Sequence, residues 1–167
     1  EYRKTDQAHL CIAMGGLSAT HPDRYVLDLL SIILGEGMSS RLFLEIRERL
    51  GLAYDVHSMV SHLRDSGAFF VYSGVDPQKS NQAVETMLTE IGSLRDGVSA
   101  EELAKAKEMS RGRLMLRMED TGAVAGWIGT QELHLGKMRT PEEVLSFVDA
   151  VTLEDLQRVA QILLVTD

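Results

Sequence analysis

The stretch that most constrains the fold is residues 39–54, which read Ser-Ser-Arg-Leu-Phe-Leu-Glu-Ile-Arg-Glu-Arg-Leu-Gly-Leu-Ala-Tyr. Its apolar residues Leu42, Ile46 and Leu50 recur at helical spacing and form one stripe. Gly51 follows the last of them, at the position where a left-handed helix cap favours glycine. The stretch therefore predicts an amphipathic α-helix that stops at a glycine and turns directly into a strand.

Charged and aromatic side chains surround this stripe. Arg41 and Glu45, and likewise Glu45 and Arg49, are four residues apart, which predicts ion pairs on the solvent side of the helix. Arg47 falls at the edge of the stripe, and Tyr54 opens the strand. Because they flank one turn, we expect the guanidinium and the phenol to lie where both can donate to the same oxygen. The alternative is an arginine that spreads its stem over apolar surface beside an ordinary strand tyrosine.

The remaining pattern predicts an α+β fold. Strands are expected over 7–13, 54–61 and 68–75, and the turn Asp65-Ser66-Gly67 joins the last two as a hairpin. Strands and helices clustered in this way favour an antiparallel or mixed sheet covered by helices. A strand after Leu164 would complete this sheet, and we expect the fragment to lack it. The expected helices are 22–33, 84–94, 99–118, 120–136, 140–148 and 152–163.

Composition narrows the class of protein. A length of 167 residues predicts a single domain, residues 1–167. The net charge of −8 argues against nucleic acid and an anionic membrane as partners. No apolar run reaches the ~20 residues of a membrane helix, and Cys11 is the single cysteine. The first residue is not Met, so we expect a fragment of a longer protein. We also expect a cytoplasmic location.

One set of residues resembles a known family. Leu34-Gly-Glu-Gly-Met-Ser-Ser-Arg-Leu-Phe43, with Arg47 and Gly51-Leu-Ala-Tyr54, is similar to the C-terminal, zinc-free domain of insulinase- and pitrilysin-type zinc metallopeptidases. The resemblance extends from about Thr5 to Leu164. The family that it points to includes the mitochondrial processing peptidases. It implies a metallohydrolase domain of the processing-peptidase type.

The resemblance also implies where the metal lies. Family enzymes bind zinc in a companion domain through His-x-x-Glu-His, a motif that none of the five histidines here forms. The nearest pair, His57 and His62, has an odd spacing that places the two on opposite faces of a strand. We therefore expect no metal ligand and no catalytic residue in this chain. Zinc is expected in a catalytic domain of the same or a partner chain.

The resemblance gives Arg47 and Tyr54 a role, because the matching residues of the family reach the substrate backbone near the zinc. It implies a non-catalytic domain that binds peptide substrate and completes the active site. Glu36 departs from the pattern, since relatives often have glycine there, and could stiffen or re-aim the loop. The alternative is a purely structural or docking subunit. A surface made for a partner also predicts weak homodimers.

Overall fold

The structure is a computed structural model that describes residues 6–165. Its three strands, β1 (Ala8–Gly15), β2 (Ala53–His62) and β3 (Gly67–Val75), form an antiparallel sheet in the order β1-β3-β2. The hairpin predicted from the sequence is β2 and β3, and β1 pairs with the other edge of β3. Strand β2 is thus an edge strand of the sheet within the described residues.

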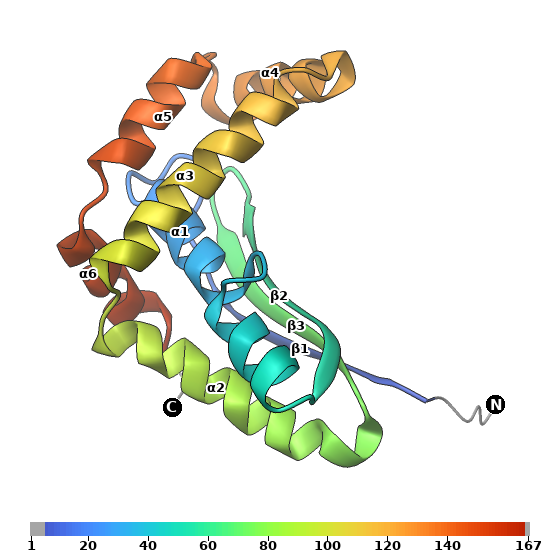
Figure 1. Ribbon diagram of the computed structural model, residues 1–167. Coiled ribbons are helices and arrows are strands. Elements are labelled where there is room, and N and C mark those ends of the chain that lie inside the picture. Colours follow the sequence, from blue (N-terminus) through green and yellow to red (C-terminus); the bar gives the residue numbers. More distant parts are fainter. Residues whose placement is uncertain (1–5, 166–167) are drawn as a thin grey trace.

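Helices pack on this sheet (Figure 1). Helix α1 lies against the strands, α3 crosses over α1, α2 runs along one end of the sheet, and α4 and α5 extend at the other end. The predicted α+β fold is therefore confirmed. The helical elements are α1 (Arg24–Gly35), η1 (Phe43–Arg49), η2 (Pro77–Lys79), α2 (Ser80–Asp96), α3 (Ala100–Arg117), α4 (Thr121–Leu135), α5 (Pro141–Ala150) and α6 (Leu153–Leu163).

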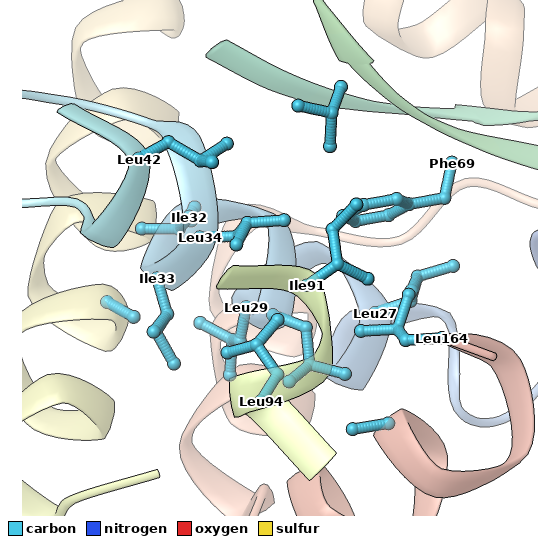
Figure 2. Close-up of a cluster of buried hydrophobic side chains, with 14 of the residues drawn as sticks. Leu27, Leu29, Ile32, Ile33, Leu34, Leu42, Phe69, Ile91, Leu94 and Leu164 are labelled. Carbon is cyan, nitrogen blue, oxygen red and sulfur yellow. The ribbon is translucent and has the colours of Figure 1, made fainter. Parts of the chain in front are cut away.

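The core forms where α1 meets the inner face of the sheet and the surrounding helices. Leu27 and Leu29 of α1 are fully buried, as are Phe69 of β3 and Ile91 of α2. Figure 2 shows these side chains converging on one apolar cluster, which Leu164 closes beyond α6. Burial of each side chain of this size contributes roughly 1.5–3 kcal/mol to the stability of the fold. Helix α1 buries most of its residues and so contributes much of the core. None of the helices within residues 6–165 has the length and apolar character needed to cross a membrane.

Several element boundaries follow local signals in the sequence. Ser99 and Glu102 form a capping box at the start of α3. The Glu102 amide donates to Ser99 Oγ, and the Ser99 amide donates to a Glu102 carboxylate oxygen. Thr140 and Glu143 form another at α5. Helix α1 begins at Arg24 rather than at Pro22, because the chain still turns at Asp23. The strand expected after Leu164 lies outside the described residues.

The end of α1 is fastened to β2 by a buried polar pair. Ser58 Oγ donates to the carbonyl of Ser31 at 2.7 Å, and the two hydroxyls lie 3.1 Å apart. A Cβ on Gly35 would lie 2.4 Å from the Ser58 amide nitrogen, so only glycine allows this approach. The contact fixes the loop after α1 beside the free edge of β2.

Candidate functional site

Arg47 and Tyr54 lie together, as expected, but in a stacked arrangement. The Arg47 guanidinium carbon is 4.9 Å from the centroid of the Phe43 ring and 4.9 Å from that of the Tyr54 ring. Arginine held over aromatic faces is stabilised by cation–π attraction, which also limits the positions that the guanidinium can take. Tyr54 is 76% exposed, and Arg47 is also exposed. The hydroxyl and the guanidinium therefore face solvent from one preorganised unit.

The helix that carries Arg47 is a π-helix rather than the predicted α-helix. The amide of Leu50 donates to the carbonyl of Glu45, five residues back, at 3.0 Å. The apolar stripe is retained, because Leu42 and Ile46 are fully buried. Gly51 then adopts a left-handed φ of 57° and turns the chain into β2, as predicted. π-Turns are rare and often occur at functional sites.

A second irregularity directs Tyr54 outward. The register of β2 against β3 pairs Ala53 with Val75 and Asp55 with Gly74, so Tyr54 is the extra residue of a β-bulge. As a result the consecutive residues Tyr54 and Asp55 both lie on the surface, where a regular strand would bury one of them. Bulges commonly re-aim side chains beside active sites.

The stack stands at the edge of a surface groove. We call it the β2 groove, and its lining comes from the loop Gly35–Met38, from Phe43 and Arg47 of η1, from Asp55–Ser58 of β2 and from Arg113 of α3. The strand that forms one wall has no neighbouring strand on this side within residues 6–165. An edge strand presents unpaired backbone amides and carbonyls, which an extended peptide can pair with.

Glu36 anchors the loop of the β2 groove. Its Oε1 accepts a hydrogen bond from Ser31 Oγ at 2.9 Å, and its Oε2 accepts one from Arg113. The side chain thereby ties the loop to α1 and α3, and its charge is paired with a cation rather than left in the groove. The sequence singled out Glu36 but not Arg113, which lies 77 residues away and carries no local signal.

Arg41 is not the solvent-exposed partner of Glu45 that its spacing predicts. It donates to both carboxylate oxygens of Glu102, at 2.7 and 3.0 Å, to Ser93 Oγ at 2.8 Å and to the carbonyl of Gly97 at 2.9 Å. Glu45 pairs with Arg49 instead, as expected for that spacing. The local prediction for Arg41 is wrong because a partly buried forked pair with several acceptors outweighs an exposed helical pair. Arg41, which directly precedes η1, thereby joins this segment to α2 and α3.

The pairing of Arg41 with Glu102 predicts that stability depends on pH. The hydrogen bonds from Arg41 lower the pKa of Glu102 to about 2 against the opposing effect of burial, and the Ser99 amide adds to the lowering. Because the folded pKa lies below the ordinary value of 4.5, the stabilisation is complete above pH 4.5 and is lost as the pH falls toward 2. We expect Glu102→Gln to remove about 3 kcal/mol of this acid-sensitive stability, measured as melting temperature against pH. Parallel curves for the wild type and Glu102→Gln between pH 6 and pH 3 would contradict it.

The histidines have other partners. His57 Nδ1 lies 3.2 Å from an Asp55 carboxylate oxygen on the open face of the sheet. His62 lies on the helix side, with Nδ1 2.6 Å from the carbonyl of Leu17 and Nε2 3.0 Å from Asp28. Burial alone would lower the pKa of His62, but the hydrogen bond and charge of Asp28 outweigh it and raise that pKa. The two side chains lie on different faces, as their odd spacing predicts, and cannot share a metal ion.

The histidine, cysteine and carboxylate side chains of residues 6–165 do not fit a zinc ion. Within the described part of the chain, no three histidine, cysteine, aspartate or glutamate side chains gather as a metal site. Cys11 is exposed on the open face of β1. Arg47 and Tyr54 present their hydrogen-bond donors to solvent next to an edge strand.

Comparisons with known proteins identify the family of this chain. The family model described as peptidase M16 inactive domain matches residues 1–110. The chain is 40% identical over 166 residues to an uncharacterized zinc protease, YmxG, of Bacillus subtilis, covering 99% of this chain and 41% of that protein. It is 38% identical over 160 residues to an uncharacterized zinc protease of Streptomyces coelicolor, covering 95% of this chain and 35% of the relative. The chain thus spans about two fifths of these relatives.

Solved structures share the fold. A conserved protein from Enterococcus faecalis superimposes with a TM-score of 0.86 at 27% identity, over 96% of this chain and 38% of that one. A peptidase M16 inactive domain from Pseudomonas fluorescens gives a TM-score of 0.83 at 23% identity, over 93% and 37% of the two chains. The sequence match covers most of this chain, so the chain belongs to the peptidase M16 inactive-domain family.

Proposed function

We propose that this chain is the substrate-binding, metal-free domain of a zinc metallopeptidase whose metal lies in a companion domain. Relatives that carry the name zinc protease are more than twice as long as this chain, which leaves room for that domain. The observation that carries the proposal is the stack of Arg47 between Phe43 and Tyr54, fixed at the edge of the β2 groove.

The chemistry of peptide hydrolysis gives these donors a function. As a peptide bond is attacked, negative charge grows on the carbonyl oxygen, and donors held in place beforehand stabilise it. The Arg47 guanidinium and the Tyr54 hydroxyl would donate to the peptide near the bond that is cut. The free edge of β2 would hold the extended backbone by strand pairing, while Arg113 stays engaged with Glu36.

A docking function has separate support. Large apolar side chains are exposed from the end of α3 onward, including Leu116 at 68%, Leu133 of α4 at 78% and Met138 at 61%. Helix α4 buries only Gln131, although its sequence is largely apolar. The remaining part of the longer protein is the occupant that would cover this surface. If docking were the whole function, Arg47 and Tyr54 would not affect turnover.

The metal assignment is tested by expressing this chain alone and within the full-length protein. We expect elemental analysis to find one zinc per full-length molecule and none, in stoichiometric amount, in the isolated chain. Peptide cleavage should be found in the full-length protein and not in the isolated chain. A tightly bound zinc in the isolated chain, together with cleavage that a chelator abolishes, would refute the proposal.

A further inference from the structure

The N-terminal end of α1 carries an arginine–aromatic cluster that the peptide site does not use. The Arg24 guanidinium lies 4.4 Å over the centroid of the Tyr25 ring, and the Arg139 guanidinium lies 4.8 Å over that of Phe147. The two rings stack on each other with centroids 5.5 Å apart and planes 6° apart. The four side chains therefore form one cluster of two stacked rings and two guanidinium groups.

Both cations share a neutral acceptor. Arg24 Nη2 and Arg139 Nη1 donate to the hydroxyl oxygen of Tyr25, the second at 3.1 Å. No carboxylate between residues 6 and 165 lies within ion-pair distance of either guanidinium. Two partly buried like charges that converge on one phenol repel each other, so an anion placed beside them is favoured.

A cavity of about 270 Å³ adjoins this cluster between α1, α3, α4 and α5. Its cationic lining comes from Arg24 and from Arg117 at the end of α3, which also lacks a carboxylate partner among the described residues. Its apolar lining comes from Trp127 and Leu135 of α4 and from Val144 of α5. A positive cavity with an apolar wall is unexpected in a chain of net charge −8.

Two polar atoms around the cavity are unsatisfied. Arg24 Nε and His134 Nδ1 are buried and have no hydrogen-bond partner among residues 6–165, so both can engage a ligand. The lining also contains one carboxylate, Asp28, but His62 Nε2 engages it at 3.0 Å. The balance of charge in the cavity thus favours a ligand with a single negative charge.

We propose that this cavity binds a small carboxylate with an apolar body. A planar guanidinium pairs with a carboxylate in a forked geometry, so Arg117 would hold the charged end. Arg24 would add a donor through Nε, because its Nη1 donates to the carbonyl of Ala19 and its Nη2 to Tyr25. Trp127, Leu135 and Val144 would contact the apolar body. The free C-terminus of a short peptide ending in an apolar residue and a free organic acid present the same chemistry.

The site is separate from the one that contains Arg47. Arg24 opens α1, whereas the β2 groove begins at Gly35, the last residue of this 12-residue helix, roughly 16 Å away along its axis. The proposal therefore does not depend on a role for Arg47 and Tyr54. Either one can fail while the other holds.

The test is calorimetric titration of the full-length protein with N-acetyl-L-leucine, with its uncharged amide and with inorganic phosphate. We expect the carboxylate to bind at least tenfold more tightly than the amide or phosphate. Arg117→Gln should weaken it about tenfold, and Arg95→Gln, a matched change on α2, should not. Arg117 suits the test because its side chain makes no hydrogen bond within the described residues. The peptide Ala-Ala-Leu and its amidated form distinguish a peptide terminus from a free acid.

Trp127 reports on the bound ligand, because it lines the cavity. A ligand-dependent change in tryptophan fluorescence that disappears in Trp127→Phe would support binding in the cavity. Equal affinity for the carboxylate and its amide would overturn the proposal. So would phosphate binding as tight as that of the carboxylate, or equal affinities in Arg117→Gln and Arg95→Gln.

Discussion

In the full-length protein, Arg47→Ala and Tyr54→Phe are each expected to lower kcat/KM on the order of a hundredfold. Losing one donor to a developing oxyanion costs about 3 kcal/mol. Both side chains are exposed, while the buried stripe of η1 is formed by Leu42 and Ile46, so zinc content and melting temperature should hardly change.

The two substitutions remove different groups from the stack. Arg47→Ala removes the guanidinium and also the cation that holds the Tyr54 ring, whereas Tyr54→Phe keeps the stacked ring and removes the hydroxyl alone. Arg47→Lys keeps a charge but loses the planar fork, so we expect it not to restore the rate. If both donors act on one carbonyl, the double variant should lose less than the sum of the single losses.

Arg49→Ala is the matched control on the same helix. Arg49 is exposed and pairs with Glu45 four residues away, so its removal should leave turnover normal. The docking function predicts another pattern, in which Arg47→Ala turns over substrate normally and the association of the domains weakens. Normal rates in Arg47→Ala together with a lowered melting temperature would therefore favour docking.

The largest loss of stability is expected from Arg41→Ala. The change removes four hydrogen bonds, to Ser93 of α2, to the carbonyl of Gly97 and to both carboxylate oxygens of Glu102. It leaves Glu102 as a partly buried carboxylate without its cation. Removing one member of a buried pair costs about 3 kcal/mol or more. The melting temperature should fall by roughly 6–12 °C for a protein of this size.

The control for this prediction is again Arg49→Ala, which should cost at most about 0.5 kcal/mol because its pair with Glu45 is exposed. Thermal unfolding of the three proteins, followed by circular dichroism under one set of conditions, provides the comparison. Equal melting temperatures for Arg41→Ala and Arg49→Ala would show that Arg41 is not a structural clamp.

Signals within a few residues of each other predicted most of the fold correctly. The capping boxes at Ser99 and Thr140 depend on side chains three residues apart, and the β2–β3 hairpin depends on one turn at Asp65-Ser66-Gly67. Helix α4 lies within the predicted range 120–136, and the structure shows that the cap at Asp120 and the left-handed Gly136 delimit it.

The candidate site was only partly predictable. Proximity of Arg47 and Tyr54 follows from one helix–turn–strand segment, but their stacking depends on a π-helix and a bulge that the apolar spacing does not reveal. Contacts between distant parts of the chain were not predictable. Arg41 and Glu102 are 61 residues apart, and Glu36 and Arg113 are 77 apart, so each pair exists only once the helices have packed.

The most direct test of the substrate-binding role is kcat/KM of Tyr54→Phe in the full-length protein, with zinc content and melting temperature measured on the same sample. The change removes one oxygen from a side chain that is 76% exposed and leaves the Arg47 stack in place. We predict a rate on the order of a hundredfold lower, with one zinc per molecule and an unchanged melting temperature. A normal rate in a zinc-loaded, folded Tyr54→Phe protein would contradict the role of Tyr54 as a substrate donor.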